Sequence, residues 1–480
     1  MKQWNSVVSA LTTLFGVRLG MLCVLAIGLM GPGYAATVYT ALSGGKTWTY
    51  TLDNSQNATI MGVDNSTGTL SLPAALDGHA VVAIGPRAFE GAAMTGVTIP
   101  DSVKSIGNYA FQDCTFMTNV TVGNGVTIIP YRCFDGCTKL NRVSLGTSVT
   151  DIGEYSFRGC QALKAIRFPT SVKKIWSYAF SGLANLESVQ LNEGLEIIES
   201  AAFRECTALQ SILLPATLKT MGSYVFNVCT QLRQIVIPNS VMSIGQCCFE
   251  DCSALTTVTW GSSLKTVPYR TFNGCKRLVS VFLPEGVVDI GEYSFEGCQA
   301  LREIRFPSSV KKIWSYAFSG LTNLESVQLN EGLEIIESGA FRECTALQSI
   351  LLPTTLKTMG GSVFNACTQL RQIVIPNSVT SIGQYCFEDC SALTTVTWST
   401  SLATVPYKTF HGCKRLVQVS LPKGVTDIGE YSFYGCHALK VIELPSTVKK
   451  IYGFAFYGLE RLETIVLNSG LEVIESNAFN

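Results

Sequence analysis

The stretch IGEYSFRGCQALKAIRFPTSVKK, residues Ile152–Lys174, decides the fold because it is one copy of a 23-residue unit. The centre of the unit, Ala/Ser-Phe-x-x-Cys, recurs along the chain, and its phenylalanine returns every 23 residues. The phenylalanines occupy positions 111, 134, 157, 180, 203, 226, 249, 272, 295, 318, 341, 364, 387, 410, 433, 456 and 479, and Phe89 precedes them at a spacing of 22. A fixed period between about 20 and 29 residues with L-x-x-I-x-F spacing is typical of a stacked leucine-rich solenoid.

The positions within one unit predict how a coil is built. We expect Phe157 and Cys160 to flank a tight helical or 3₁₀ turn. A short strand follows and ends at Pro169, because proline cannot donate a hydrogen bond to a sheet. The other inward residues belong to this strand and to a second extended stretch: Leu163, Ile166, Phe168, Val172 and Ile175. The sequence thus predicts a β-rich leucine-rich-repeat solenoid with a parallel sheet along one face.

Length and composition agree with this architecture. A chain of 480 residues would ordinarily form about three domains, but a solenoid grows in one dimension and needs no single core. Apolar residues make up 47% of the chain and charged residues 15%, and the formal net charge is zero. The absence of a basic excess argues against nucleic acid or an anionic membrane as the main partner.

The chain before Val81 lacks the repeat. Lys2 and Arg18 precede the apolar run Leu19–Met30, and small residues follow, so residues 1–36 are predicted to be a signal peptide. An uncleaved membrane anchor is the alternative. Residues 37–80 contain alternating patches, Lys46–Thr51 and Ala58–Val63, which predict a β-hairpin N-terminal cap. The solenoid itself is predicted to occupy residues 81–480.

The 18 cysteines would suggest disulfides in an exported protein. Thirteen of them stand three residues after the repeat phenylalanine, and Leu183, Leu321 and Leu459 take their place in other units. A position that accepts either Cys or Leu behaves as a small buried hydrophobe. We therefore expect a column of buried thiols, with disulfides between neighbouring coils as the alternative.

The unit resembles the BspA-type leucine-rich repeat family of bacterial surface proteins. The segments that carry the resemblance are IGNYAFQDC (Ile106–Cys114), LRQIVIPNSVTSIG (Leu370–Gly383) and the leader LPAALDGHAVVAIGPRAFEG (Leu72–Gly91). The resemblance extends from about Leu72 to Asn480, which is most of the chain. It implies an exported protein, secreted or at the cell surface, that binds extracellular proteins of a host matrix or of neighbouring cells.

A longer period, six units in length, lies over the 23-residue one. KKIWSYAFSGL occurs at Lys173–Leu183 and Lys311–Leu321, and KKIYGFAFYGL at Lys449–Leu459. Block duplication is the simplest cause. The last unit opens at Ile474 and is incomplete, which we interpret as the end of a fragment, with a frayed terminus or an end-to-end contact as alternatives.

The outward positions of the strand are the candidate binding surface, and they stand seven, eight and ten residues after each phenylalanine. The last of these positions predicts an exposed apolar stripe, Leu213, Val236 and Phe282, repeated in Leu351 and Val374. Basic spots are predicted at Lys164 with Arg167 and at Arg302 with Arg305, beside Glu187 and Glu325. An apolar stripe flanked by charges is typical of a protein-binding surface. The alternative is that aliphatic residues merely suit a strand and that the charges pair across coils.

The sequence offers little for catalysis. Glu303 and Glu325 are interleaved with arginines, so ion pairing is favoured over acid–base work. His411 and His437 stand beside column cysteines but have no third partner for a nucleophile or a zinc site. We expect no enzyme activity, no catalytic residue, no cofactor and no metal ion. A structural surface spacer and a glycan-active solenoid enzyme are the competing classes, and the oligomeric state stays open.

Overall fold

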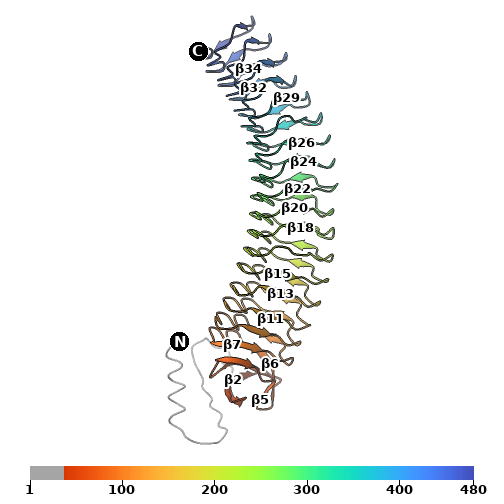
Figure 1. Cartoon of the computed structure of the whole chain (residues 1–480), viewed down its shortest axis with the longest axis vertical. Helices are drawn as coiled ribbons and strands as arrows, with labels where there is room; N and C mark the ends of the chain where they lie inside the picture. The colour runs from red at the N-terminus through yellow and green to blue at the C-terminus, as the bar shows by residue number, and fades with distance from the viewer. Residues whose placement is uncertain (1–36) are drawn as a thin grey trace.

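The computed structural model describes residues 37–480, so the predicted signal peptide lies outside the described residues. The chain winds into coils stacked along one axis, giving a long, gently curved rod with a small β-sheet at its N-terminal end (Figure 1). The described residues form 38 strands and no helix. The predicted β-rich solenoid of 23-residue coils with parallel sheets is confirmed.

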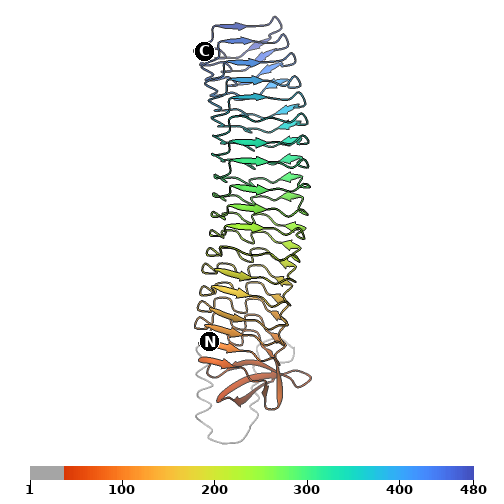
Figure 2. The same cartoon turned by 45° about the vertical axis from the view of Figure 1, so that its right-hand side comes forward.

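One side of most coils is a strand of three to five residues, and together these strands form the wide sheet, whose rungs cross the rod one above another (Figure 2). Adjacent rungs run parallel; Ala165 pairs with Ser188 and Arg167 with Gln190. The wide sheet contains β4 (Gly68–Ser71), β7 (Met94–Thr98), β9 (Asn119–Thr121), β11 (Arg142–Ser144), β13 (Ala165–Arg167), β15 (Ser188–Gln190), β18 (Gln234–Val236), β20 (Thr257–Thr259), β22 (Ser280–Phe282), β24 (Glu303–Arg305), β26 (Ser326–Gln328), β29 (Gln372–Val374), β31 (Thr395–Thr397), β33 (Gln418–Ser420), β35 (Val441–Glu443) and β37 (Thr464–Val466).

The wide sheet is divided into short groups of two to four strands. The coils that carry Leu213 and Leu351 contribute no strand at this side, which separates β15 from β18 and β26 from β29. The surface is therefore a series of short parallel sheets, although the coils continue without interruption.

A second side of the coil forms the narrow sheet, in which each coil after the first contributes two residues. It corresponds to the second extended stretch predicted after Pro169. Its strands are β6 (His79–Ile84), β8 (Ser105–Ile106), β10 (Ile128–Ile129), β12 (Asp151–Ile152), β14 (Lys174–Ile175), β16 (Ile197–Ile198), β17 (Thr220–Met221), β19 (Ser243–Ile244), β21 (Thr266–Val267), β23 (Asp289–Ile290), β25 (Lys312–Ile313), β27 (Ile335–Ile336), β28 (Thr358–Met359), β30 (Ser381–Ile382), β32 (Thr404–Val405), β34 (Asp427–Ile428), β36 (Lys450–Ile451) and β38 (Val473–Ile474).

The third side of the coil consists of consecutive β-turns where the sequence suggested a helical or 3₁₀ turn. In one unit Ser156 N donates to Gly153 O, Arg158 N to Tyr155 O and Cys160 N to Phe157 O, each at 3.2 Å. Tyr155 and Gly159 have positive φ angles, 56° and 76°, at the third position of the first and last of these turns, as in type II turns.

These left-handed residues recur in nearly every coil and explain why no helix forms. They turn alternate amides toward the next coil, so that Tyr155 N donates to Ser177 O (3.2 Å) and Phe157 N to Ala179 O (2.9 Å). A left-handed conformation costs about 1–2 kcal/mol in a non-glycine residue, and the bonds between coils offset that cost. The turn side is thus a third ladder of hydrogen bonds along the rod.

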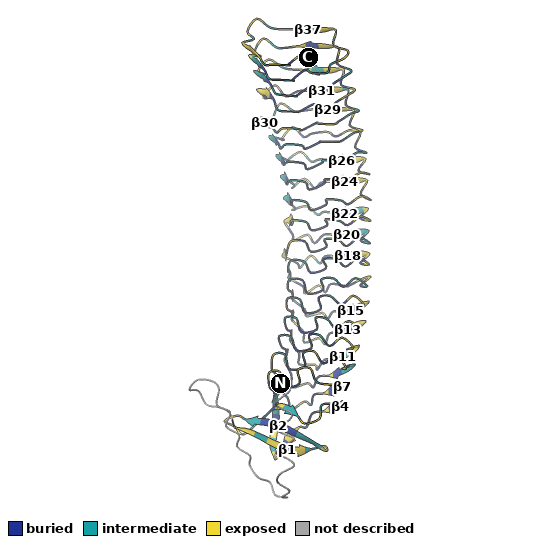
Figure 3. Ribbon diagram, turned by 90° about the vertical axis from the view of Figure 1, so that its left-hand side faces the viewer, coloured by how far each residue is buried: buried dark blue, intermediate teal, exposed yellow. Residues whose placement is uncertain are grey.

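The core is made of columns of buried side chains stacked inside the three sides. Figure 3 colours each residue of the coils by its burial. Phe157 is fully buried, and its ring stacks on that of Phe180 with the centroids 5.2 Å apart and the planes within 5°. Parallel rings at this separation are a favourable aromatic arrangement. Each phenylalanine therefore couples its coil to the next.

The N-terminal end is a sheet continuous with the coils. β1 (Val38–Ser43) pairs antiparallel with β2 (Lys46–Leu52), and β2 with β3 (Ala58–Val63), while β5 (Ala75–Leu76) pairs with β6. β3 and β4 already pair in parallel with β6 and β7. The first coil is thus covered by a hairpin. The boundary proposed at residue 80 remains a prediction, since parallel pairing begins before it.

Candidate functional site

The outward side chains of the wide sheet are exposed in the alternating order that the sequence predicted. In β13 the side chains of Ala165 and Arg167 are exposed and Ile166 between them is buried. The predicted apolar residues all point to solvent on this surface: Leu213 is 81% exposed, Val236 56%, Phe282 66%, Leu351 80% and Val374 55%. Large aliphatic and aromatic side chains exposed to this extent cost solvation free energy unless a partner covers them.

The predicted apolar stripe is interrupted by a polar residue. The register pairs Val236 with Thr259 and Thr259 with Phe282, so a threonine separates the two apolar side chains. At about 4.8 Å per rung, Val236 and Phe282 lie about 10 Å apart. Val279, which the sequence argument missed, is 50% exposed and immediately precedes the strand that carries Phe282. We call Leu213, Val236, Val279 and Phe282 the apolar patch.

The predicted basic spots are largely neutralised by neighbours. Lys164 Nζ lies 3.4 Å from Glu187 Oε1, and an Arg302 guanidinium nitrogen lies 2.8 Å from Glu325 Oε1, in each case across one coil. Arg305 lies 3.7 Å from Glu303 in its own strand. Exposed pairs of this kind contribute about 0–1 kcal/mol. Charge pairing accounts for three of the four predicted basic residues.

Arg167 is different, since within residues 37–480 it makes no ion pair. It lines a shallow hollow of about 510 Å³ on the wide sheet together with Arg142, which is also unpaired in the described chain. The remaining lining residues are amides, hydroxyls and small apolar side chains, with no carboxylate. We call Arg142 and Arg167 the arginine pair. Arg142 was not predicted; it stands at the second outward position, eight residues after Phe134.

The cysteine column consists of free thiols. All 17 cysteines in the described part of the chain are buried and unbridged. Cys160 Sγ donates to the carbonyl oxygen of Phe134 at 3.3 Å, a contact that recurs in the other coils with cysteine. Burial raises the pKa of the Cys160 thiol well above its usual range and that of Cys206 to about 12. A buried, protonated thiol is a poor nucleophile.

The two C-terminal histidines are half-buried on the turn side. His411 Nδ1 is 3.4 Å from Glu388 Oε1, and His437 Nδ1 is 3.4 Å from Glu460 Oε1. Their cysteine neighbours in the sequence point into the core. Among the described residues no three His, Cys, Asp or Glu side chains gather as a metal site would require.

The stacked coils, the Phe and Cys columns and the parallel sheets define a leucine-rich-repeat solenoid. The sequence matches the family described as "BspA type Leucine rich repeat region (6 copies)" at residues 82–209, 156–279, 266–394 and 380–480, which overlap and together span the solenoid. The chain belongs to this BspA-type leucine-rich repeat family.

Several solved structures resemble the chain. A leucine-rich repeat protein from Bacteroides ovatus is 23% identical over 93% of this chain and 90% of its own, with a TM-score of 0.32. A leucine rich cell surface protein from Faecalibacterium prausnitzii is 26% identical over 80% and 94%, with a TM-score of 0.39. The pneumococcal vaccine antigen PcpA is 17% identical over 87% and 94%, with a TM-score of 0.34. Because these TM-scores are low, the family assignment rests on the sequence match. Comparison with curated protein sequences gave no match.

No element within residues 37–480 is a helix long and apolar enough to cross a bilayer.

Proposed function

We propose that this protein is an exported, non-enzymatic adhesion module that binds extracellular proteins through the wide sheet. The observation that carries the proposal is the apolar patch, in which Leu213 and Phe282 expose 81% and 66% of their side chains on a flat, preformed surface. Interface centres are rich in aromatic and aliphatic side chains, and their rims are polar.

The surroundings of the patch fit such an interface. The paired charges Arg302 and Glu325 lie beyond Phe282 at one end, and the arginine pair lies toward the N-terminus at the other. A complementary partner would present apolar side chains to the patch and a carboxylate to Arg142 and Arg167. Because hydrogen bonds fix the backbone of every coil to the next, little ordering entropy would be lost on binding.

The test is binding to a panel of purified extracellular-matrix proteins, measured by surface plasmon resonance. We expect the variant Leu213→Glu, Val236→Glu and Phe282→Glu to bind at least tenfold more weakly, about 1.4 kcal/mol. The matched control places three glutamates at exposed polar positions of the same column, Gln328, Thr397 and Ser420. Equal binding by wild type and both variants would show that the apolar patch is not the interface.

A surface spacer is the second candidate, and the length of the rod favours it (Figure 1). A spacer would bind none of the panel proteins in any variant. Removal of one six-coil block would shorten its reach and leave the remaining coils folded. A glycan-active enzyme is tested separately: glycan cleavage by the purified chain would contradict the non-enzymatic assignment.

A further inference from the structure

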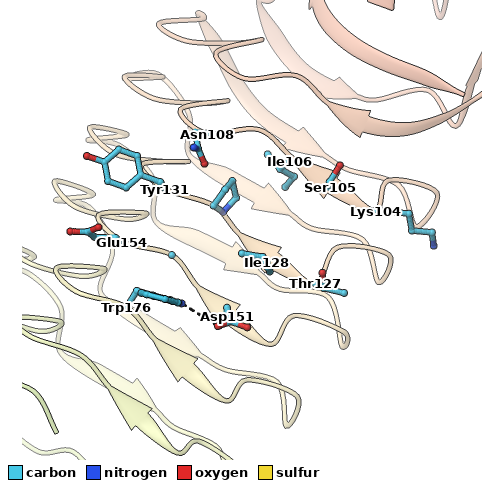
Figure 4. A pocket seen from close by; sticks show the side chains of 12 residues that line it. Lys104, Ser105, Ile106, Asn108, Thr127, Ile128, Tyr131, Asp151, Glu154 and Trp176 are labelled. Carbon is cyan, nitrogen blue, oxygen red and sulfur yellow. Dashed lines mark hydrogen bonds between the residues drawn. The ribbon is translucent and has the colours of Figure 1, made fainter. Parts of the chain in front are cut away.

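A second hollow, of about 500 Å³, lies on the narrow sheet, away from the surface that the proposed function uses. Four consecutive coils line it, and Trp176 closes its C-terminal end (Figure 4). Trp176 is the first large side chain at its position of the repeat. The same position in the three preceding coils is Gly107, Pro130 and Gly153. Pro130 and Gly153 line the hollow, and a Cβ on Gly153 would come within 2.8 Å of the Pro130 backbone, so this position carries no side chain and the space beside the indole stays open.

Trp176 is held in place although 40% of it is exposed. Its Nε1 donates to Asp151 Oδ1 at 3.1 Å. The Lys174 ammonium lies 3.5 Å from the centroid of the indole and 2.7 Å from Glu199 Oε1. Trp176 lines the hollow, whereas Lys174 and Glu199 do not. The indole is thus a fixed, half-exposed platform.

Polar side chains from the three preceding coils line the hollow along the axis of the rod. Asp151, Glu154, Asn108, Ser105 and Lys104 line the hollow with Tyr131, and Figure 4 shows these side chains distributed along its length. Asp151 Oδ2 accepts from Thr150 Oγ1 at 2.7 Å, which fixes the carboxylate. A flat aromatic face with carboxylate, amide and hydroxyl groups along the same hollow is the composition of a site for a small ligand with one apolar face and several polar substituents.

The geometry points to a pyranose sugar as the ligand, with its C–H face on the Trp176 indole and its hydroxyls on Asp151 and Glu154, one coil away. A cationic ligand would also be attracted to carboxylates and an aromatic ring. The Lys174 ammonium already lies against this indole, however, and would repel a second cation placed on it. A neutral, hydroxyl-rich ring meets no such repulsion.

The arrangement recurs at the six-coil interval. Trp314 is 41% exposed with Lys312 at 3.5 Å, and Tyr452 has Lys450 at 4.0 Å. Lys312 pairs with Glu337 at 2.6 Å and Lys450 with Glu475 at 2.8 Å, as Lys174 does with Glu199. Six coils at about 4.8 Å each place the three aromatic platforms about 29 Å apart. A surface that displays many copies of one sugar could engage all three at once, which raises avidity.

The test uses the full chain and four defined probes: methyl β-D-glucopyranoside, methyl β-D-galactopyranoside, methyl α-D-mannopyranoside and N-acetylglucosamine. Saturation-transfer NMR should show transfer to the ring C–H protons of at least one probe. Transfer should fall to background in the variant Trp176→Ala, Trp314→Ala and Tyr452→Ala. The control is Phe116→Ala, because Phe116 is 53% exposed with Lys139 at 4.9 Å but does not line the hollow, and it should leave transfer unchanged.

A second measurement needs no variant: the bound sugar should shield the exposed tryptophans of the wild type from quenching by acrylamide. The apolar-patch variant with glutamates at 213, 236 and 282 should still bind the sugar, so the two proposals fail independently. Absence of transfer from all four probes would overturn the inference. So would transfer that survives in the triple variant, or transfer to tetramethylammonium in place of the sugars.

Discussion

Replacement of Phe272 by alanine tests whether the phenylalanine column holds the coils together. Phe272 is fully buried in the middle of the rod, and its ring centroid lies 5.6 Å from that of Phe249 and 5.2 Å from that of Phe295. Truncation of a buried phenylalanine costs about 3–5 kcal/mol. An edge-on contact with Trp260, at 5.6 Å between centroids, is the third aromatic contact that would be lost. Because such contacts are worth about 0.5–1.5 kcal/mol each, we expect a total cost of about 4 kcal/mol.

The matched control is Phe479→Ala at the last coil. Phe479 is 39% exposed and stacks on Phe456 alone, at 5.3 Å. With one contact and partial burial it should cost about 1 kcal/mol.

The assay is guanidinium unfolding followed by circular dichroism. In a solenoid each coil contacts only its neighbours, so a weak central interface separates the unfolding of the two halves. We expect Phe272→Ala to lower the first midpoint and to broaden or split the transition, and Phe479→Ala to leave a single transition close to wild type. Equal effects of the two variants would refute a column that couples coil to coil.

Three further outcomes are expected. Val228→Gly should stabilise the protein by about 0.5–1 kcal/mol in the same assay, because the β-branched Val228 has a φ of 61° at a turn position that is glycine in many other coils. A loss of stability would mean that the side-chain contacts of Val228 outweigh the backbone strain. Ser309→Ala should cost about 1–3 kcal/mol, since Ser309 Oγ donates to Val287 O (2.7 Å) and accepts from Gly286 N (2.9 Å). Ser308→Ala removes one exposed hydrogen bond, from Ser308 Oγ to Glu285 Oε2 (2.9 Å), and should cost less, about 0.5 kcal/mol. Burial raises the pKa of the column thiols, to about 12 for Cys206. The free energy of unfolding should therefore be fully present below the unfolded thiol pKa of about 8.5 and should fall as pH rises toward the folded value. A free energy of unfolding that stays constant from about pH 8 to 11, or fewer than half of the thiols free on titration in denaturant, would contradict the buried thiol column.

The fold could be predicted from the sequence because every coil repeats the same pattern of inward-facing residues. Phe157 and Cys160 identify the inward positions, and Pro169 ends the first strand. The turn side was not predicted correctly in detail. The positive φ of Tyr155 is stabilised by the hydrogen bond that its backbone N–H donates to Ser177 O in the next coil, and no local propensity favours a tyrosine there.

The candidate site could be predicted only in part. The exposure of Phe282 follows from strand alternation, and Leu213 is exposed at the same position of the repeat although its coil forms no strand there. The pairing of Lys164 with Glu187 and the isolation of Arg167 depend on which side chains face each other across coils. The hollow beside Trp176 was not predicted, because no sequence motif marks it. It depends on the absence of a large side chain at Gly153 and Pro130, one and two coils before the tryptophan.

The near-identity of the six-coil blocks has a consequence for how the length of this protein can change. Phe180 stacks on Phe203 with centroids 5.4 Å apart, and Phe318 on Phe341 at 5.5 Å, so equivalent junctions in two blocks are structurally interchangeable. Unequal recombination between the corresponding DNA segments would add or remove one whole block while every core column continued across the join. The reach of the rod could then vary between lineages in steps of about 29 Å, with the spacing of its aromatic platforms preserved at each step.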